Sequence, residues 1–215
     1  MKNRTFFYRV FFYRGYLQGL FVALLVCYAW FFPDPLIWGT WPDRLADITG
    51  VASLTLGLML RIWAVSHAGR HTRSRKIKAP LLITTGPYSC VRNPIYLGNF
   101  LIGFSLVVLA EALALIPFYV VVFVLQYRKI VEQEEIFLRN KFGDAFERYC
   151  ETVPRWFPRL KASPRALTFG PNFYFKELGT TCGFLFGAFV LEWMESPYRR
   201  VVISFLRQLG RISKL

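Results

Sequence analysis

Four long apolar runs, separated by short charged connectors, occupy residues 15–32, 48–68, 94–110 and 112–127. Each run approaches the roughly 20 residues that an α-helix needs to cross the hydrocarbon core of a bilayer, which is about 30 Å thick. Only Arg61 places a full charge inside one of them. The last two runs are short for this purpose, which indicates tilted helices or a locally thin membrane. The pattern therefore predicts about four transmembrane helices.

The last two runs should form a helical hairpin with Glu111 at its tip. Pro94 suits the first turn of its helix, where the missing N–H costs nothing, and Gly98 is small enough for another helix or a ligand to come close. Pro117 should kink the fourth helix. We expect that helix to continue past its apolar run, through a charged stretch, until Gly143 ends it.

The connectors carry their charges in the pattern of a membrane protein. The segment before the first run, the connector 69–93 and the chain after residue 127 are basic, whereas the connector 33–47 holds mostly Asp. Because cytoplasmic connectors carry the excess of Lys and Arg, both termini should face the cytoplasm. No small-residue cleavage site follows the first run, so we expect a retained anchor rather than a signal peptide.

Composition points to the same class of protein. Of the 215 residues, 54% are hydrophobic and 18% aromatic, more than a soluble core of that size requires. The net charge of +14 could serve nucleic acid or an anionic membrane, and its confinement to the connectors favours the membrane over nucleic acid. We predict an all-α integral membrane protein of an inner (plasma) membrane or an endoplasmic reticulum membrane, according to the organism.

Cysteine and histidine usage predicts no metal site and no disulfide framework. The four Cys residues lie far apart, without a Cys-x-x-Cys pair, and are expected to be free thiols. The two histidines, His67 and His71, could bind a metal weakly as an i,i+4 pair, or they could simply lie at the membrane interface.

The chain divides into a membrane domain over residues 1–160 and a basic C-terminal extension over 161–215. Residues 178–194 are apolar enough for a fifth span, but the basic residues after them would then lie outside, against the charge rule. We therefore expect a helix packed into, or lying on, the inner leaflet. Residues 202–212 have the pattern of an amphipathic surface helix, and a helix that covers the protein itself explains them equally well.

Glu134 is the unusual charge of the fourth helix. Arg128, Glu132, Glu135 and Arg139 fall on one stripe of alternating sign, which is typical of a solvated face. The helical neighbours of Glu134 are apolar instead, and a carboxylate is costly to bury unless it meets a cation or hydrogen-bond donors. Either it pairs with Arg92 or another basic loop residue, or it receives the ammonium or hydroxyl groups of a ligand.

The loop 80–93 supplies the other half of a possible site. Gly86 and Pro87 form a turn, Tyr88 offers a ring and a hydroxyl, and Arg92 offers a planar cation. The helix that follows begins with unpaired backbone N–H groups, which attract a carboxylate. A ligand that carries both a carboxylate and a cation would suit this arrangement.

The stretches GPYSCVRNPIYLGNF at 86–100 and EEIFLRNKFGDAFERYCETVPRWFP at 134–158 resemble the isoprenylcysteine carboxyl methyltransferase and phospholipid methyltransferase superfamily. The resemblance covers about residues 76–160. It implies an S-adenosyl-L-methionine-dependent methyltransferase in the membrane, with the cofactor pocket at the cytoplasmic face. It also implies a lipid or lipid-tailed small molecule as methyl acceptor.

The resemblance further implies which residues hold the cofactor. The implied cofactor-binding residues are Leu82, Ile83, Tyr88, Asn93, Pro94, Tyr96, Gly98 and Glu134. Beside these, we predict Arg92, Arg128 and Glu135 as the catalytic residues, on the grounds of their charges and positions rather than of the resemblance. If the acceptor is an amine or a hydroxyl, Glu135 or Tyr127 is the candidate base.

Two positions depart from the superfamily pattern. Asn93 stands where the pattern has His, so a proton-transfer role is absent there, although Asn can still hydrogen-bond the cofactor. Ile130 stands where the prenylcysteine branch has a substrate-binding Arg, which Arg128 or Lys129 would have to replace. The identity of the acceptor is therefore open.

Two other functions fit parts of the chain. KFGDAFERYCETVPRWFP at 141–158 is also similar to membrane sterol and enone reductases, which use NADPH. The adjacent carboxylates Glu134 and Glu135 argue against a dinucleotide phosphate at that place. A non-catalytic membrane scaffold that binds lipid or a partner protein is the third interpretation.

Overall fold

The computed structural model describes residues 19–29, 36, 40–68, 79–159 and 175–195. Within these ranges all regular structure is helical, which confirms the all-α prediction. The helices are Gly19–Ala29, α2 (Trp41–Ala68), α3 (Pro94–Leu109), α4 (Ile116–Phe142), α5 (Asp144–Thr152) and α6 (Phe175–Glu195), with short 3-10 helices η2 (Gly86–Ser89) and η3 (Leu113–Leu115).

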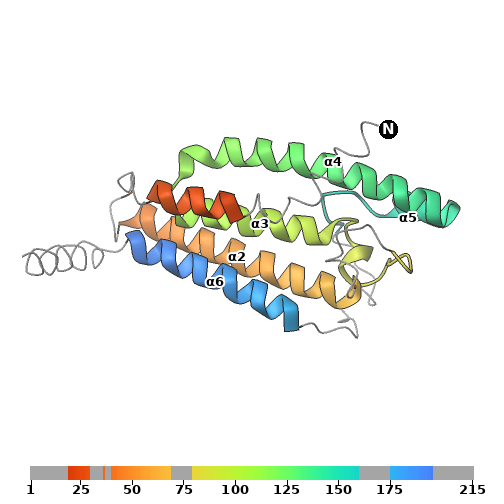
Figure 1. Cartoon of the computed structure of the whole chain (residues 1–215), viewed down its shortest axis with the longest axis horizontal. Helices are drawn as coiled ribbons and strands as arrows, with labels where there is room; N and C mark the ends of the chain where they lie inside the picture. Colours follow the sequence, from red (N-terminus) through yellow and green to blue (C-terminus); the bar gives the residue numbers. More distant parts are fainter. Residues whose placement is uncertain (1–18, 30–35, 37–39, 69–78, 160–174, 196–215) are drawn as a thin grey trace, which may run out of the picture.

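The long helices lie side by side in an elongated bundle (Figure 1). At one end, which we call the loop end, α2 finishes, the loop with η2 leads into α3, and α5 lies beside the last part of α4. At the opposite end, the hairpin end, α3 passes through η3 into α4. The shared core includes Leu25, Leu54, Ile102, Leu106 and Leu191, which come from four helices.

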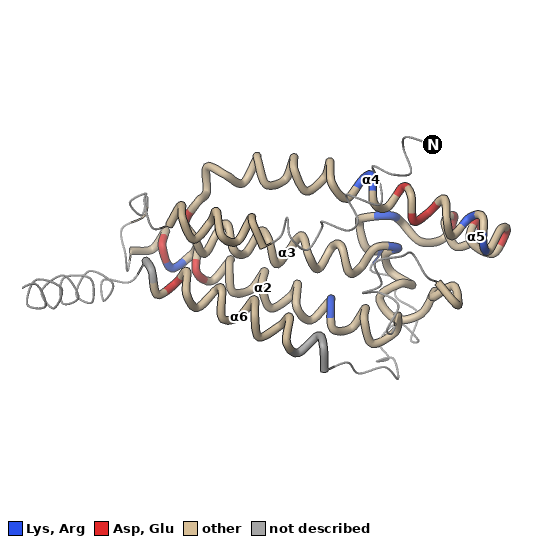
Figure 2. Tube along the Cα trace, viewed as in Figure 1, with Lys and Arg blue, Asp and Glu red and all other residues tan. Residues whose placement is uncertain are grey.

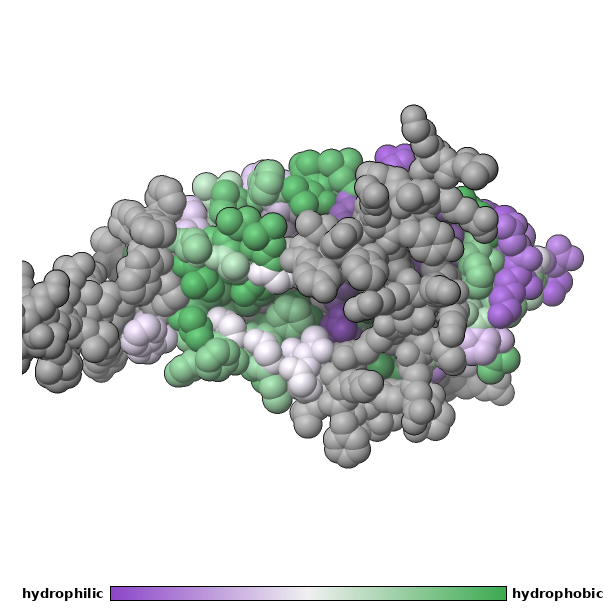
Figure 3. Space-filling view, in the orientation of Figure 1, coloured by the Kyte–Doolittle hydropathy of each residue, from purple (hydrophilic) through white to green (hydrophobic). Residues whose placement is uncertain are grey.

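Two described helices are long and apolar enough to span a membrane: α2, and the stretch Leu113–Phe142 that contains α4. Gly19–Ala29 and α3 are shorter apolar helices. Charged residues gather toward the two ends of the bundle (Figure 2), and the visible surface is hydrophobic along much of its length and hydrophilic at the loop end (Figure 3). These features support the expected membrane protein.

The hairpin forms as expected, except at Pro117. Glu111 occupies the tip with a φ of 45°, and its Oε2 accepts a hydrogen bond of 3.0 Å from the backbone N–H of Leu36. Pro117 lies in the first turn of α4, where it fits without loss of a hydrogen bond, so the predicted kink is wrong. At the other end of α4, Gly143 has a φ of 52° and ends the helix as predicted.

The C-terminal helix α6 is a member of the bundle. It runs alongside α2 (Figure 1), and Leu191 is completely buried in the shared core. Glu192 lies near Asp47 at the start of α2, so α6 ends at the hairpin end. Leu185, Phe186 and Phe189 of the same helix are exposed, and the expectation that this helix packs into, or lies on, the inner leaflet stays a prediction. The expected amphipathic helix at 202–212 lies outside the described residues.

The close crossing of α2 and α3 depends on two glycines. A Cβ added to Gly98 would lie 2.9 Å from the carbonyl oxygen of Gly57, and a Cβ added to Gly57 would lie equally close to the carbonyl of Gly98. Neither backbone carbonyl can move aside without shifting its helix. Small residues at such crossings let helix backbones approach in the membrane.

We predict that Gly98→Ala destabilises the protein by about 1–3 kcal/mol, because overpacking at a helix crossing forces the helices apart. Gly183→Ala on α6 is the matched control, since nothing lies within 4 Å of its added Cβ. Thermal unfolding in detergent, followed by circular dichroism, measures both variants. Equal melting temperatures for the two would contradict the role of this crossing.

Candidate active site

A carboxylate and three aromatic rings meet where α3 begins and α4 leaves the apolar part of the bundle. The hydroxyl of Tyr96 donates a hydrogen bond of 2.5 Å to Oε1 of the half-buried Glu134. The ring of Tyr96 packs against Tyr127 with centroids 4.8 Å apart, and Tyr127 stacks on Phe123 at 4.1 Å. The hairpin therefore brings together two predicted site residues, Tyr96 and Glu134.

A chain of polar contacts extends this cluster to α2. Nη1 of Arg61 donates a hydrogen bond to Oδ1 of Asn99, and Nδ2 of Asn99 donates one of 3.1 Å to the hydroxyl of Tyr127. Sequence reasoning did not place Arg61 or Asn99 in the site. Two signals could have found them: a lone charge in an apolar run is typically functional, and Asn99 follows Tyr96 by three positions on one helix face.

Tyr88 approaches the same cluster from the loop. The turn before it requires Gly86, whose φ is 59°. Burial raises the pKa of the Tyr88 hydroxyl above its ordinary value, the nearby Tyr149 and Glu134 raise it further, and Arg61 lowers it in part. The phenol of Tyr88 therefore stays neutral and can donate a hydrogen bond.

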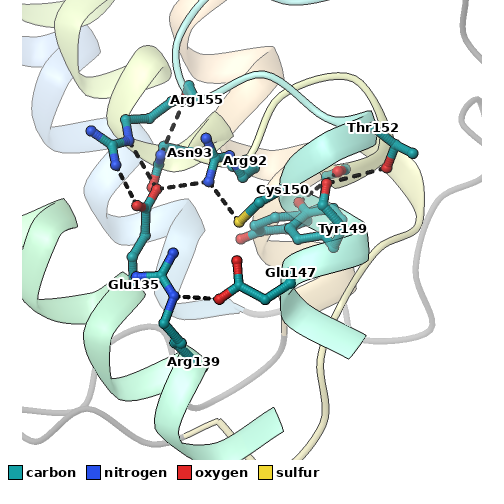
Figure 4. A network of polar contacts seen from close by, with 10 residues as sticks. Arg92, Asn93, Glu135, Arg139, Glu147, Tyr149, Cys150, Thr152 and Arg155 are labelled. Atoms are coloured by element: carbon teal, nitrogen blue, oxygen red, sulfur yellow. Dashed lines mark hydrogen bonds and ion pairs between the residues drawn. The ribbon is translucent and has the colours of Figure 1, made fainter. Parts of the chain in front are cut away.

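Glu135, the next residue on α4, is buried between two arginines (Figure 4). Arg155 contacts both carboxylate oxygens, with Nε 3.0 Å from Oε1 and Nη2 2.5 Å from Oε2. Nη1 of Arg92 lies 3.2 Å from Oε1. The prediction that Glu135 lies on a solvated stripe is wrong, because its counter-charges come from outside α4. Arg92 pairs with Glu135 rather than with Glu134.

Backbone contacts bind the segment 153–159, after α5, to the loop before α3. The hydrogen bonds are Arg92 N to Pro154 O at 2.9 Å, Asn93 Nδ2 to Arg155 O at 3.1 Å, and Arg159 N to Cys90 O at 3.0 Å. From α5 itself, the hydroxyl of Tyr149 donates to the carbonyl oxygen of Tyr88 over 2.7 Å. We call α5 together with residues 153–159 the clasp, since it fixes the loop that carries Tyr88.

Cys150 of the clasp receives a hydrogen bond of 2.8 Å from Nη1 of Arg92 (Figure 4). Burial raises the pKa of the Cys150 thiol, and the charge of Arg92 lowers it only in part. The thiol is therefore a neutral hydrogen-bond partner rather than a nucleophile. Among the residues that the structure describes, no cluster of three His, Cys, Asp or Glu side chains is placed to hold a metal ion.

The structure shows where the other predicted site residues lie, but their positions do not test their predicted roles. Gly98 lies at the crossing with α2, Pro94 is buried in the first turn of α3, and Leu82 packs against the small core around α5. Ile83 is half-buried and Arg128 is exposed. Their assignment to cofactor binding or catalysis stays a prediction.

We predict that Glu135→Leu destabilises the loop end by about 3 kcal/mol, because it leaves Arg92 buried without its carboxylate. Hydrogen exchange measured by mass spectrometry should show faster exchange over residues 86–93. Glu147→Leu is the control, since it breaks the exposed Glu147–Arg139 pair on the same surface. The role of the buried pair would be refuted by equal exchange in both variants.

Comparison with known proteins shows which families and proteins the chain is similar to. Residues 45–145 match the family model described as phospholipid methyltransferase. The chain is similar to the cobalt-zinc-cadmium resistance protein of Cupriavidus metallidurans, with 32% identity over 57% of this chain and 53% of that protein. It is also similar to the protein-S-isoprenylcysteine O-methyltransferases of Schizosaccharomyces pombe, with 31% identity over 50% of this chain and 47% of that protein, and of Homo sapiens, with 29% identity over 56% and 45%. No solved structure matches the chain.

The chain spans about half the length of the curated relatives it matches. The matched segment 45–145 nevertheless contains the whole polar cluster, namely Arg61, Tyr88, Tyr96, Asn99, Tyr127 and Glu134. Through this segment the chain is similar to phospholipid and isoprenylcysteine methyltransferases, which is the resemblance that its motifs predict.

Proposed function

We propose that the protein transfers a methyl group from S-adenosylmethionine to a lipid or lipophilic small molecule at the cytoplasmic membrane face. Its superfamily supports methyl transfer in general. The observation that carries the proposal is the Tyr96–Glu134 pair, a carboxylate among aromatic rings at one end of an apolar bundle. Such a carboxylate is stabilised when a cationic or hydroxyl-bearing ligand meets it.

The residues at this place fit the proposed methyl donor, which supplies an activated methyl group on a positively charged sulfur. Glu134 would accept hydrogen bonds from ammonium or hydroxyl groups, and the rings of Tyr88 and Tyr96 would attract the cation. No side chain caps the first turn of α3, so its backbone N–H groups after Asn93 are suited to a carboxylate. The backbone of residues 82–83 would complete the site.

Arg92 and Glu135 are better suited to positioning than to proton transfer. Both oxygens of Glu135 contact arginines, and the pair fixes the loop that carries Tyr88. Arg128 is exposed and would contact the acceptor only if that molecule carried an anionic group. The clasp would thus contribute to catalysis by fixing the position of the loop that carries Tyr88.

Orientation and exclusion of water supply most of the catalysis in this proposal. The bound donor would supply an activated methyl group, and Tyr88, Tyr96 and Glu134 would hold it beside the acceptor. A carboxylate acceptor needs no base, whereas a hydroxyl or an amine must lose a proton, for which Tyr127 is the candidate. Because charge on sulfur disappears during the reaction, a dry site with fixed geometry favours it.

We predict that Glu134→Gln weakens S-adenosylmethionine binding about 30-fold, because a neutral amide replaces a charged hydrogen-bond acceptor. Isothermal titration calorimetry on the detergent-solubilised protein measures this affinity. Glu132→Gln, an exposed carboxylate on the same helix, should bind like the original protein. Unchanged affinity in Glu134→Gln would remove Glu134 from the site, and binding of NADPH in place of S-adenosylmethionine would favour a reductase.

We further predict that membranes of cells producing the protein contain a lipid heavier by one methylene unit than in cells lacking it. Mass spectrometry of lipid extracts would reveal the acceptor. Cells producing the Glu134→Gln variant at the same level are the control and should lack the product. The same product in both cultures would show that this site does not make it.

A further inference from the structure

A pocket of about 170 Å³ lies beside the polar cluster, inside the apolar part of the bundle. Its walls come from the helix Gly19–Ala29, α3, α4 and α6, and none of its lining residues is charged. Asn99 and Tyr127 line the pocket and also belong to the polar chain that leads to α2. A molecule in the pocket would therefore touch the groups around the proposed methyl-donor site.

Gln126 is the unusual residue of this pocket. It lines the cavity, and its amide nitrogen Nε2 is buried without a hydrogen-bond partner among the described residues. A buried donor that lacks a partner is costly, so native proteins rarely keep one without a functional reason. Most of the lining around it is aliphatic or aromatic and offers no acceptor, and a ligand can provide one.

We infer that the pocket binds the apolar part of the methyl acceptor, and that Gln126 selects an acceptor with a neutral oxygen in that part. This inference rests on the proposed methyl transfer. A charged group would lose its solvation here without a counter-charge, so the oxygen belongs to a ketone, ester or ether. The amide N–H of Gln126 donates a hydrogen bond to it.

The size of the pocket limits what enters it. A cavity of roughly 150 Å³ in a protein core holds one benzene molecule, and this pocket is similar in size. The pocket is open beside Phe118 and Val122, whose side chains are exposed, so it holds one ring or a short stretch of one chain while the rest of the acceptor extends outside the bundle. Six aromatic rings surround this space, those of Phe21, Phe118, Tyr119, Phe123, Tyr127 and Phe184.

The test compares two radiolabelled probes that differ in one group, with the full chain in lipid nanodiscs and binding to empty discs subtracted. One probe is geranylacetone, a single-chain ketone, and the other is the hydrocarbon in which a methylene replaces its carbonyl. The protein should bind the ketone about fivefold more tightly, the usual gain from one hydrogen bond. Gln126→Leu should lose this preference. Gln133→Leu, which replaces a glutamine outside the pocket on the same helix, should keep it.

Stability gives an independent measurement. Gln126→Leu should raise the melting temperature, because it removes a buried donor that has no partner among the described residues, whereas Gln133→Leu should not. Equal binding of the two probes, or a ketone preference that survives in Gln126→Leu, would overturn the inference. Calorimetry with S-adenosylmethionine on the same samples separates the two proposals. Cofactor binding without ketone preference rejects only the inference, whereas ketone preference without cofactor binding rejects the methyl transfer and leaves Gln126 in a pocket that binds neutral lipid.

Discussion

Two consecutive carboxylates on α4 determine how the loop end is built. Successive residues of a helix point about 100° apart, so Glu134 and Glu135 face different partners. Glu135 is buried with two arginines, which fixes the clasp against the loop. Glu134 meets the hydroxyl of Tyr96 among aromatic rings. Glu135 thus connects the clasp to the loop, whereas Glu134 lies at the place where a ligand is proposed to bind.

The close crossing of α2 and α3, which requires two small residues, determines how far apart the polar side chains of the site lie. Gly57 and Gly98 allow the helix backbones to touch, and Arg61 lies one turn beyond Gly57 on α2. At that separation Arg61 reaches Asn99, and Asn99 reaches Tyr127 on the next helix. A wider crossing would break the first of these contacts and leave a cation in the apolar part of the bundle. Packing and electrostatics therefore depend on the same two glycines.

The sequence was sufficient for the features that one helix or one loop determines by itself. The apolar runs, the hairpin tip at Glu111 and the end of α4 at Gly143 follow from local pattern. The different surroundings of Glu134 and Glu135 do not follow from local pattern. The burial of Glu135 depends on Arg155, which reaches it only after the chain turns back through α5. The contacts of α6 within the bundle could not be predicted for the same reason, since periodicity indicates an apolar face but not which helices pack against it.

The pocket and the polar cluster share Asn99 and Tyr127, so in the proposed methyl transfer the choice of substrate would be linked to reaction geometry. A chain held in the pocket by its apolar part and by Gln126 would direct its remaining end toward Tyr127 and Tyr96. Orientation of this kind needs no mobile acid or base, so it can act without water inside a membrane bundle. The buried Nε2 of Gln126 has no partner among the described residues and would lower stability in the empty protein, which binding of the acceptor would restore. If the pocket binds an acceptor in this way, selection for binding rather than for stability would explain why a glutamine lies in the apolar half of α4.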